Sequence, residues 1–165
     1  MAKGGQFCRF LHSTGRLEYK DFFYQGRKVG GLFFYEKGKI TEYDFLSFDG
    51  ELLYNAKYDD LGSIKEFGGQ IINEHPSTGL VDDKQENSLF LYIIQPPSVS
   101  IKYSINIFDS TSQKRSLFKA IPKTQNMFVE LVLPNAPDKA SYFIQADYED
   151  SLNKFYKVHI KPFQF

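Results

Sequence analysis

Short runs of hydrophobic residues recur about every twelve residues in the first half of the chain. Two aromatic triplets, at residues 22–24 and 33–35, are each followed by a polar turn that holds one glycine. Glycines continue this spacing at Gly15, Gly26, Gly38, Gly50 and Gly62. Aromatic and β-branched residues fit a pleated sheet surface, and glycine supplies the positive φ of a tight turn. The pattern therefore predicts one strand and one turn per repeat, and it leaves no room for capped helices.

The second half of the chain alternates with a period of two. Ile101, Tyr103 and Ile105 alternate with Lys102, Ser104 and Asn106. The same period recurs at residues 129–133, 142–148 and 156–160, with turn-forming residues between these stretches. Alternation of this kind is typical of strands that bury one face, and several such strands in series indicate a β-sandwich. The sequence predicts an all-β fold, an antiparallel β-meander of about twelve-residue repeats followed by an immunoglobulin-like β-sandwich.

A polar stretch that interrupts both patterns lies at residues 73–87. It holds Pro76, Gly79 and a run of acidic and amide side chains. Turn formers over such a length are typical of a connection between two units. We predict a repeat domain at residues 1–74, a linker at 75–87 and a sandwich domain at 88–165.

One repeat, Tyr58–Ile64 (YDDLGSI), resembles the units of bacterial YD and MORN-type repeats. The resemblance covers about residues 13–72. It implies a β-hairpin sheet with a scaffolding or binding role rather than a reaction. Some MORN-variant repeats belong to families named as antitoxins, which implies an alternative role in toxin immunity.

The segment Leu133–Tyr148 resembles the late strands of bacterial immunoglobulin-like and fibronectin-type modules. Those strands often begin at Leu-Pro and continue, after a short loop, as Gly-x-Tyr-x-Ile-x-Ala-x-Tyr. Here Ala140 stands where the glycine is usual. The resemblance covers about residues 88–165 and implies a β-sandwich, an architecture that hosts many unrelated functions.

Composition and charge narrow the classes of partner. The chain is 42% hydrophobic, has no tryptophan, and carries 20 basic and 20 acidic side chains divided evenly between its halves. Without a basic field, nucleic acid is disfavoured as a partner. No apolar run approaches the roughly 20 residues of a membrane span. No apolar signal region follows Lys3, so we expect a cytoplasmic protein, or a protein of the bacterial periplasm or cell surface whose leader was removed.

Candidate catalytic and metal-binding residues are few. Cys8 is the only cysteine, and His12, four residues later on a strand, would lie about 13 Å away, too far for a shared hydrogen bond. An acidic loop with Asp147, Glu149 and Asp150 has oxygen ligands for Ca²⁺ but lacks the EF-hand order, so a solvated turn is favoured. We therefore predict no catalytic residue, no metal site and no cofactor.

The aromatic triplets are the best candidate for a binding surface. On a strand, adjacent side chains point to opposite faces. We predict a surface of four tyrosines that face a ligand, with Phe23 and Phe34 on the opposite, buried face. Those tyrosines are Tyr24, Tyr35, Tyr43 and Tyr54. A tyrosine ring supplies contact area and its hydroxyl tolerates water; the alternative is that all of these side chains are interior.

Together these patterns favour a non-enzymatic binding or scaffold module of a bacterial cell envelope. Its expected partner is a protein or a cell-surface polymer. Two alternatives stay open: a cytosolic immunity or antitoxin-like protein that binds a toxin, and a carbohydrate-binding module. The absence of tryptophan weakens the carbohydrate alternative, although tyrosine also stacks on sugars.

Overall fold

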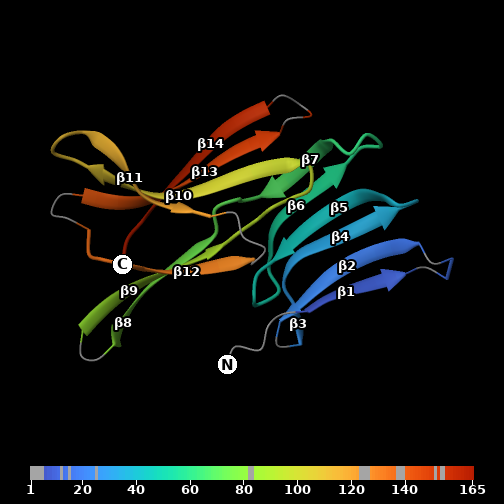
Figure 1. Cartoon of the computed structure of the whole chain (residues 1–165), viewed down its shortest axis with the longest axis horizontal. Coiled ribbons are helices and arrows are strands. Elements are labelled where there is room, and N and C mark those ends of the chain that lie inside the picture. Colours follow the sequence, from blue (N-terminus) through green and yellow to red (C-terminus); the bar gives the residue numbers. More distant parts are fainter. Residues whose placement is uncertain are drawn as a thin grey trace. The chain divides into compact units, whose positions relative to one another are not determined.

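The computed structural model describes residues 6–165 except 12, 15, 25, 82–83, 123–126, 137–139, 151 and 153–154. The described residues form fourteen β-strands and no helix, which confirms the all-β prediction (Figure 1). None of them forms a helix of the length and apolarity needed to cross a membrane. Two compact units make up the chain. The first is Met1–Ile71, Ile94–Val99 and Asp150–Phe155, and the second is Ile72–Ile93, Ser100–Glu149 and Tyr156–Phe165.

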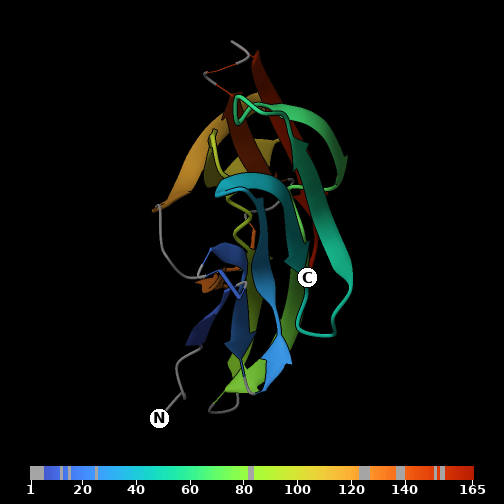
Figure 2. The same cartoon turned by 90° about the vertical axis from the view of Figure 1, so that its right-hand side faces the viewer.

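The first unit contains one sheet of seven strands in the order β1-β2-β4-β5-β6-β7, with β3 paired to β2. All of its neighbouring strands are antiparallel. Figure 2 shows these blue-to-green strands following one another as hairpins. The bounds are β1 (Gln6–Leu11), β2 (Leu17–Tyr24), β3 (Arg27–Lys28), β4 (Gly30–Glu36), β5 (Lys39–Leu46), β6 (Leu52–Tyr58) and β7 (Ile64–Gly69).

The β5–β6 and β6–β7 turns share one bonding scheme, twelve residues apart. The Ser47 hydroxyl accepts hydrogen bonds from the backbone N–H groups of residues 49 and 51, and the Asp59 carboxylate accepts the equivalent bonds from residues 61 and 63. Gly50 and Gly62 occupy the same left-handed position, with φ of 83° and 81°. A register shift follows each turn. This is a turn with a glycine bulge, so the repeat period reflects local turn chemistry.

The turn glycines of the sequence pattern are confirmed where the structure describes them. Gly38 lies at the β4–β5 turn with φ of 81°, next to Lys37 with φ of 52°. Two successive positive φ values identify a two-residue hairpin of the I′ kind, which suits the twist of the flanking strands. Gly50 and Gly62 lie at the following turns. Gly15 lies outside the described residues.

The core of the first unit lies on one face of this sheet. Tyr43 and Phe45 on β5, and Tyr54 and Ala56 on β6, are each at most 2% exposed. Phe45 is the Cα partner of Tyr54. Gly31 on β4 allows a close approach, because a Cβ there would lie 2.9 Å from the Tyr43 ring. Large rings therefore fill the space that a glycine leaves open.

The second unit contains two sheets, β11-β10-β13-β14 and β12-β9-β8. Their strands are β8 (Glu74–Val81), β9 (Lys84–Tyr92), β10 (Val99–Asp109), β11 (Lys114–Ile121), β12 (Phe128–Leu133), β13 (Ala140–Asp150) and β14 (Phe155–Phe163). Alternate side chains of three of these strands are buried, at Leu89, Leu91, Ile101, Tyr103, Ile105, Tyr142, Ile144, Ala146 and Tyr148. This is the period of two seen in the sequence.

The segment that the sequence predicts as a linker is largely β-strand. Residues 75–81 belong to β8 and residues 84–87 begin β9, and the two strands pair along their whole length. The sequence pattern did not predict these two strands over residues 75–87. Pro76 is compatible with a strand because β8 is the edge of its sheet, where one side of the backbone needs no partner. The first stretch of the first unit ends at Ile71, and the division into independently folding domains stays a prediction.

Candidate functional site

Two of the four tyrosines that were predicted to form a binding surface are buried. Tyr43 and Tyr54 are 2% and 1% exposed, and their ring centroids lie 6.2 Å apart. Tyr54 also stacks on Phe67 of β7 at 6.3 Å. The prediction that these two tyrosines face a ligand is wrong, because their rings fill the core beside Gly31. A phenol buries well when its ring has close neighbours, and the hydroxyl does not keep it at the surface.

The other two predicted tyrosines are half-buried. The Tyr24 ring contacts Phe48 at 5.6 Å. Burial raises the pKa of Tyr35, and the nearby positive charge of Arg9 partly offsets this rise. Phe23 and Phe34 are only half-buried. Phe34 is the Cα partner of Glu42, so it shares a sheet face with that acidic side chain, and the prediction of a buried face for the two phenylalanines is wrong. The four tyrosines therefore do not form one exposed patch.

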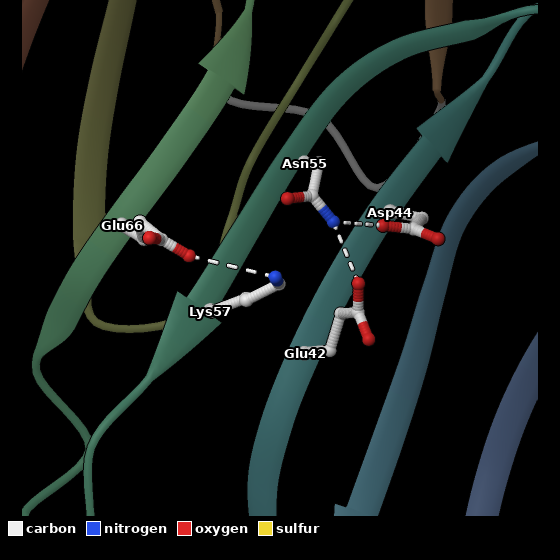
Figure 3. Close-up of polar contacts among 5 residues, drawn as sticks. All are labelled: Glu42, Asp44, Asn55, Lys57 and Glu66. Atoms are coloured by element: carbon white, nitrogen blue, oxygen red, sulfur yellow. Dashed lines mark hydrogen bonds and ion pairs between the residues drawn. The ribbon is translucent and has the colours of Figure 1, made fainter.

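The opposite face of the repeat sheet carries a lattice of polar side chains (Figure 3). Glu42 and Asp44 on β5 are the Cα partners of Lys57 and Asn55 on β6. The Asn55 amide donates to Glu42 Oε1 at 2.8 Å and to Asp44 Oδ1 at 2.5 Å. Across the next pair of strands, Lys57 Nζ lies 3.5 Å from Glu66 Oε2. One neutral amide thus bridges two carboxylates, and an exposed ion pair continues the row.

This lattice has the chemistry of a solvated sheet face. Burial raises the pKa of Asp44, the hydrogen bond from Asn55 lowers it, and the charge of Glu42 raises it again; the net shift is upward. Among the described residues, no group of three or more histidine, cysteine or acidic side chains is arranged to hold a metal ion. The described residues of the lattice therefore form no such cation-binding group.

We predict that Asp44→Asn raises the melting temperature (Tm) at pH 7. Burial raises the pKa of Asp44 above its ordinary 3.8, so the folded state holds the proton more tightly than the unfolded state. Ionisation therefore costs stability as the pH rises from 3.8 through the folded pKa. The variant escapes this cost and keeps an acceptor for Asn55. Its gain over the parent should be present at pH 7 and vanish below pH 3.8.

Asp60→Asn is the matched control, because Asp60 is exposed at the β6–β7 turn. Thermal unfolding followed by circular dichroism between pH 3 and pH 7 measures both variants. A rise in Tm for Asp44→Asn that is the same at pH 3 and pH 7, or a fall in Tm at pH 7, would contradict the raised pKa of Asp44.

A pocket of about 280 Å³ lies in the second unit, lined by residues of β9, β13 and β14 and of the segment that follows β12. Three aromatic rings and three side-chain amides line it: Tyr142, Phe163, Phe165, Asn87, Asn135 and Gln164. Two alanines and a serine complete the lining. We call these residues the aromatic–amide pocket.

Hydrogen bonds and stacked rings hold the inner wall of the pocket. The buried Asn87 amide donates to Asn135 Oδ1 at 2.7 Å. The Tyr142 hydroxyl donates to the backbone carbonyl of Pro134 at 3.1 Å, and its ring stacks on Phe163 with centroids 5.8 Å apart. Phe165 stands edge-on to both rings, at interplanar angles of 80° and 89°. These contacts link the residues of the inner wall to one another.

The described lining residues offer aromatic rings and neutral polar groups. None of them is acidic, basic, histidine or cysteine. Burial raises the pKa of Tyr142, so its phenol stays neutral at physiological pH. Ser141 contributes a hydroxyl, and the described lining residues include no base that could activate it. These residues can stack on a ligand and form neutral hydrogen bonds with it.

The candidate catalytic and calcium-binding residues from the sequence do not form a site among the described residues. Cys8 lies on β1, and His12 lies outside the described residues. Asp147 accepts hydrogen bonds from Gln145 and Tyr156, whereas Asp150, three residues along the same strand, accepts one from the backbone of residue 152. Residues an odd number apart on a strand face opposite ways, so these two carboxylates do not converge on one cation.

The aromatic–amide pocket is the site that the sequence did not reveal. Its lining comes from three stretches that are far apart in the chain: residue 87, residues 135–136 with 140–142, and residues 163–165. The available signal was the pair Phe163 and Phe165 after the last period-two strand, where aromatic residues continue beyond the sandwich pattern.

Comparison of the chain with protein-family models, with curated proteins and with solved structures finds no match. The geometry of the described residues therefore carries the functional argument by itself.

Proposed function

We propose that the protein is a non-enzymatic binding module, with an uncharged ligand held in the aromatic–amide pocket. One observation carries this proposal: three aromatic rings and three amides surround a space of about 280 Å³ with no charged side chain in the described lining. Ligand sites are mostly apolar pockets with a few placed polar groups, which is the composition found here. The cell-envelope setting rests on the resemblance of the two halves to bacterial repeat and immunoglobulin-like units.

A finer proposal concerns the fold of the second unit, which we propose is an immunoglobulin-like or fibronectin-type sandwich. Its strands are divided into sheets of four and three. The Tyr142 hydroxyl, near the start of β13, reaches back to the carbonyl of Pro134. A tyrosine bonded in this way to the backbone a few residues upstream is a known feature of such sandwiches. In these modules the loops at the sheet ends commonly carry the ligand site.

The test fills the pocket without removing a contact from its wall. Ala136 lines the pocket and is half-buried, so Ala136→Phe should occupy the space. Full-length protein labelled with ¹⁵N is titrated with a panel of small neutral fragments that include sugars, capped peptides and aromatic amides. We expect some fragments to shift the side-chain amide signals of Asn87, Asn135 and Gln164. Ala136→Phe should weaken this binding at least tenfold.

The matched control is Ala120→Phe, the same substitution at an exposed position of β11 outside the pocket lining. It should bind the fragments as the parent does. Circular dichroism melts establish that both variants are folded. A panel in which no fragment shifts the three amides, or in which the filled pocket binds equally well, would overturn the proposed function.

A further inference from the structure

Resting on the proposed function, we infer that the aromatic–amide pocket binds one ring of a neutral saccharide. The absence of charged side chains among the described lining residues, the size of the pocket and the arrangement of its polar groups lead to this ligand class.

The lack of charged side chains in the described lining disfavours ionic ligands. A carboxylate, phosphate or ammonium group that enters the pocket loses hydration, and no described lining side chain of opposite charge replaces it. Burying an unpaired charge is costly, whereas a hydroxyl needs only a neutral donor or acceptor. The ligand is therefore polar but uncharged.

Size limits the ligand to one ring. The volume of about 280 Å³ is just below the roughly 300–1,000 Å³ typical of small-molecule sites. The exposed rim, formed by Asn135 and Gln164, lets the rest of a longer ligand continue into solvent. This arrangement fits one unit of a polymer better than an isolated large molecule.

The polar groups at the rim match hydroxyls. Asn135 Oδ1 already accepts a hydrogen bond from Asn87, which leaves the –NH₂ group of Asn135 to donate to a ligand. Gln164 adds an amide that both donates and accepts. Phe165 is 40% exposed beside them and offers a flat apolar surface. A sugar ring has an apolar C–H face that packs on an aromatic ring, and hydroxyls at its edge that pair with amides.

The test compares matched ligands on the full chain. Neutral tetrasaccharides of glucose, mannose, xylose and N-acetylglucosamine, a uronate tetrasaccharide and a capped trialanine peptide are titrated separately. The reporters are the side-chain amide signals of Asn135 and Gln164. We expect at least one neutral tetrasaccharide to shift both signals in a saturable way. The uronate should bind at least tenfold more weakly than that sugar.

Rim variants then test the assigned groups. Asn135→Ala and Gln164→Ala should each weaken binding of the neutral sugar about three- to tenfold, the range expected for one lost hydrogen bond. Gln113→Ala, in the exposed β10–β11 turn, is the matched amide control and should leave binding unchanged. Circular dichroism melts with a single cooperative transition establish that the rim variants are folded; Asn135→Ala should lower the Tm somewhat, because the buried Asn87 amide loses its acceptor.

The outcomes separate this inference from the proposed function. If the capped peptide or other neutral fragments bind in the pocket and the sugars do not, the saccharide assignment is wrong and the binding module stands. Equal binding of the uronate, or full affinity in both rim variants, likewise overturns the saccharide assignment. If no probe shifts the pocket amides, both the inference and the proposed function fail.

Discussion

Tyr54→Ala is expected to destabilise the first unit by about 3–5 kcal/mol, the cost typical of removing a large buried aromatic side chain. Tyr54 is 1% exposed and contacts the rings of both Tyr43 and Phe67. Its loss leaves a cavity between β5 and β7 that the rigid sheet cannot close. With about 2–4 °C for each kcal/mol, Tm should fall by about 6–20 °C. Thermal and urea unfolding of the full chain measure the change.

Tyr35→Ala is the matched control for this substitution. Tyr35 lies on a strand of the same sheet but is only half-buried. Its removal exposes less apolar surface and leaves no closed cavity, so it should cost clearly less than Tyr54→Ala. Equal losses at the two positions, or a Tyr54 variant as stable as the parent, would show that the tyrosine rings do not form the core.

Gly69→Ala is the second substitution with a large expected effect. Gly69 has φ of 83°, and a Cβ there would overlap the carbonyl oxygen of Leu53 and lie 2.9 Å from the Cα of Tyr54. Left-handed strain costs about 1–3 kcal/mol and displacement of a packed backbone about as much again, so we expect a loss of about 2–6 kcal/mol. Urea unfolding of the full chain gives this value directly.

The neighbouring glycine provides the control. Gly68 lies on the same strand, and a Cβ built there meets no atom within 4 Å. Gly68→Ala should therefore change stability by no more than about 0.5 kcal/mol. The contrast between adjacent positions isolates the close approach of β7 to β6. A Gly69→Ala variant that is as stable as Gly68→Ala would show that β7 does not approach β6 so closely at Gly69.

The sequence predicted where the strands run better than which face they bury. The turn glycines and the period of two located most strands, because both signals are local. The opposite facing of Tyr35 and Phe34 also followed from alternation alone. The burial of Tyr43 was missed, although β5 itself holds the signal: Glu42 and Asp44 alternate with Tyr43 and Phe45. Charged neighbours mark the outer face more reliably than a hydroxyl does.

Two features depend on partners that the sequence does not name. The β8 strand contains Pro76 and Gly79, which locally favour turns, and its pairing with β9 overrides that preference. The aromatic–amide pocket depends on the meeting of three distant stretches of the chain, held partly by the bond between Asn87 and Asn135. Neither can be derived from spacing, because tertiary contacts decide both.

The two equivalent turns, at Ser47–Glu51 and Asp59–Ser63, have a consequence for how this sheet can change in evolution. Each turn is built from bonds among its own five residues, so a duplicated segment of twelve residues carries its turn with it. Neighbouring antiparallel strands run in opposite directions. Gain of a single segment would therefore deliver the following chain to the wrong end of the sheet. Only gains or losses in pairs preserve the exit point, so sheets of this kind should lengthen by two strands at a time.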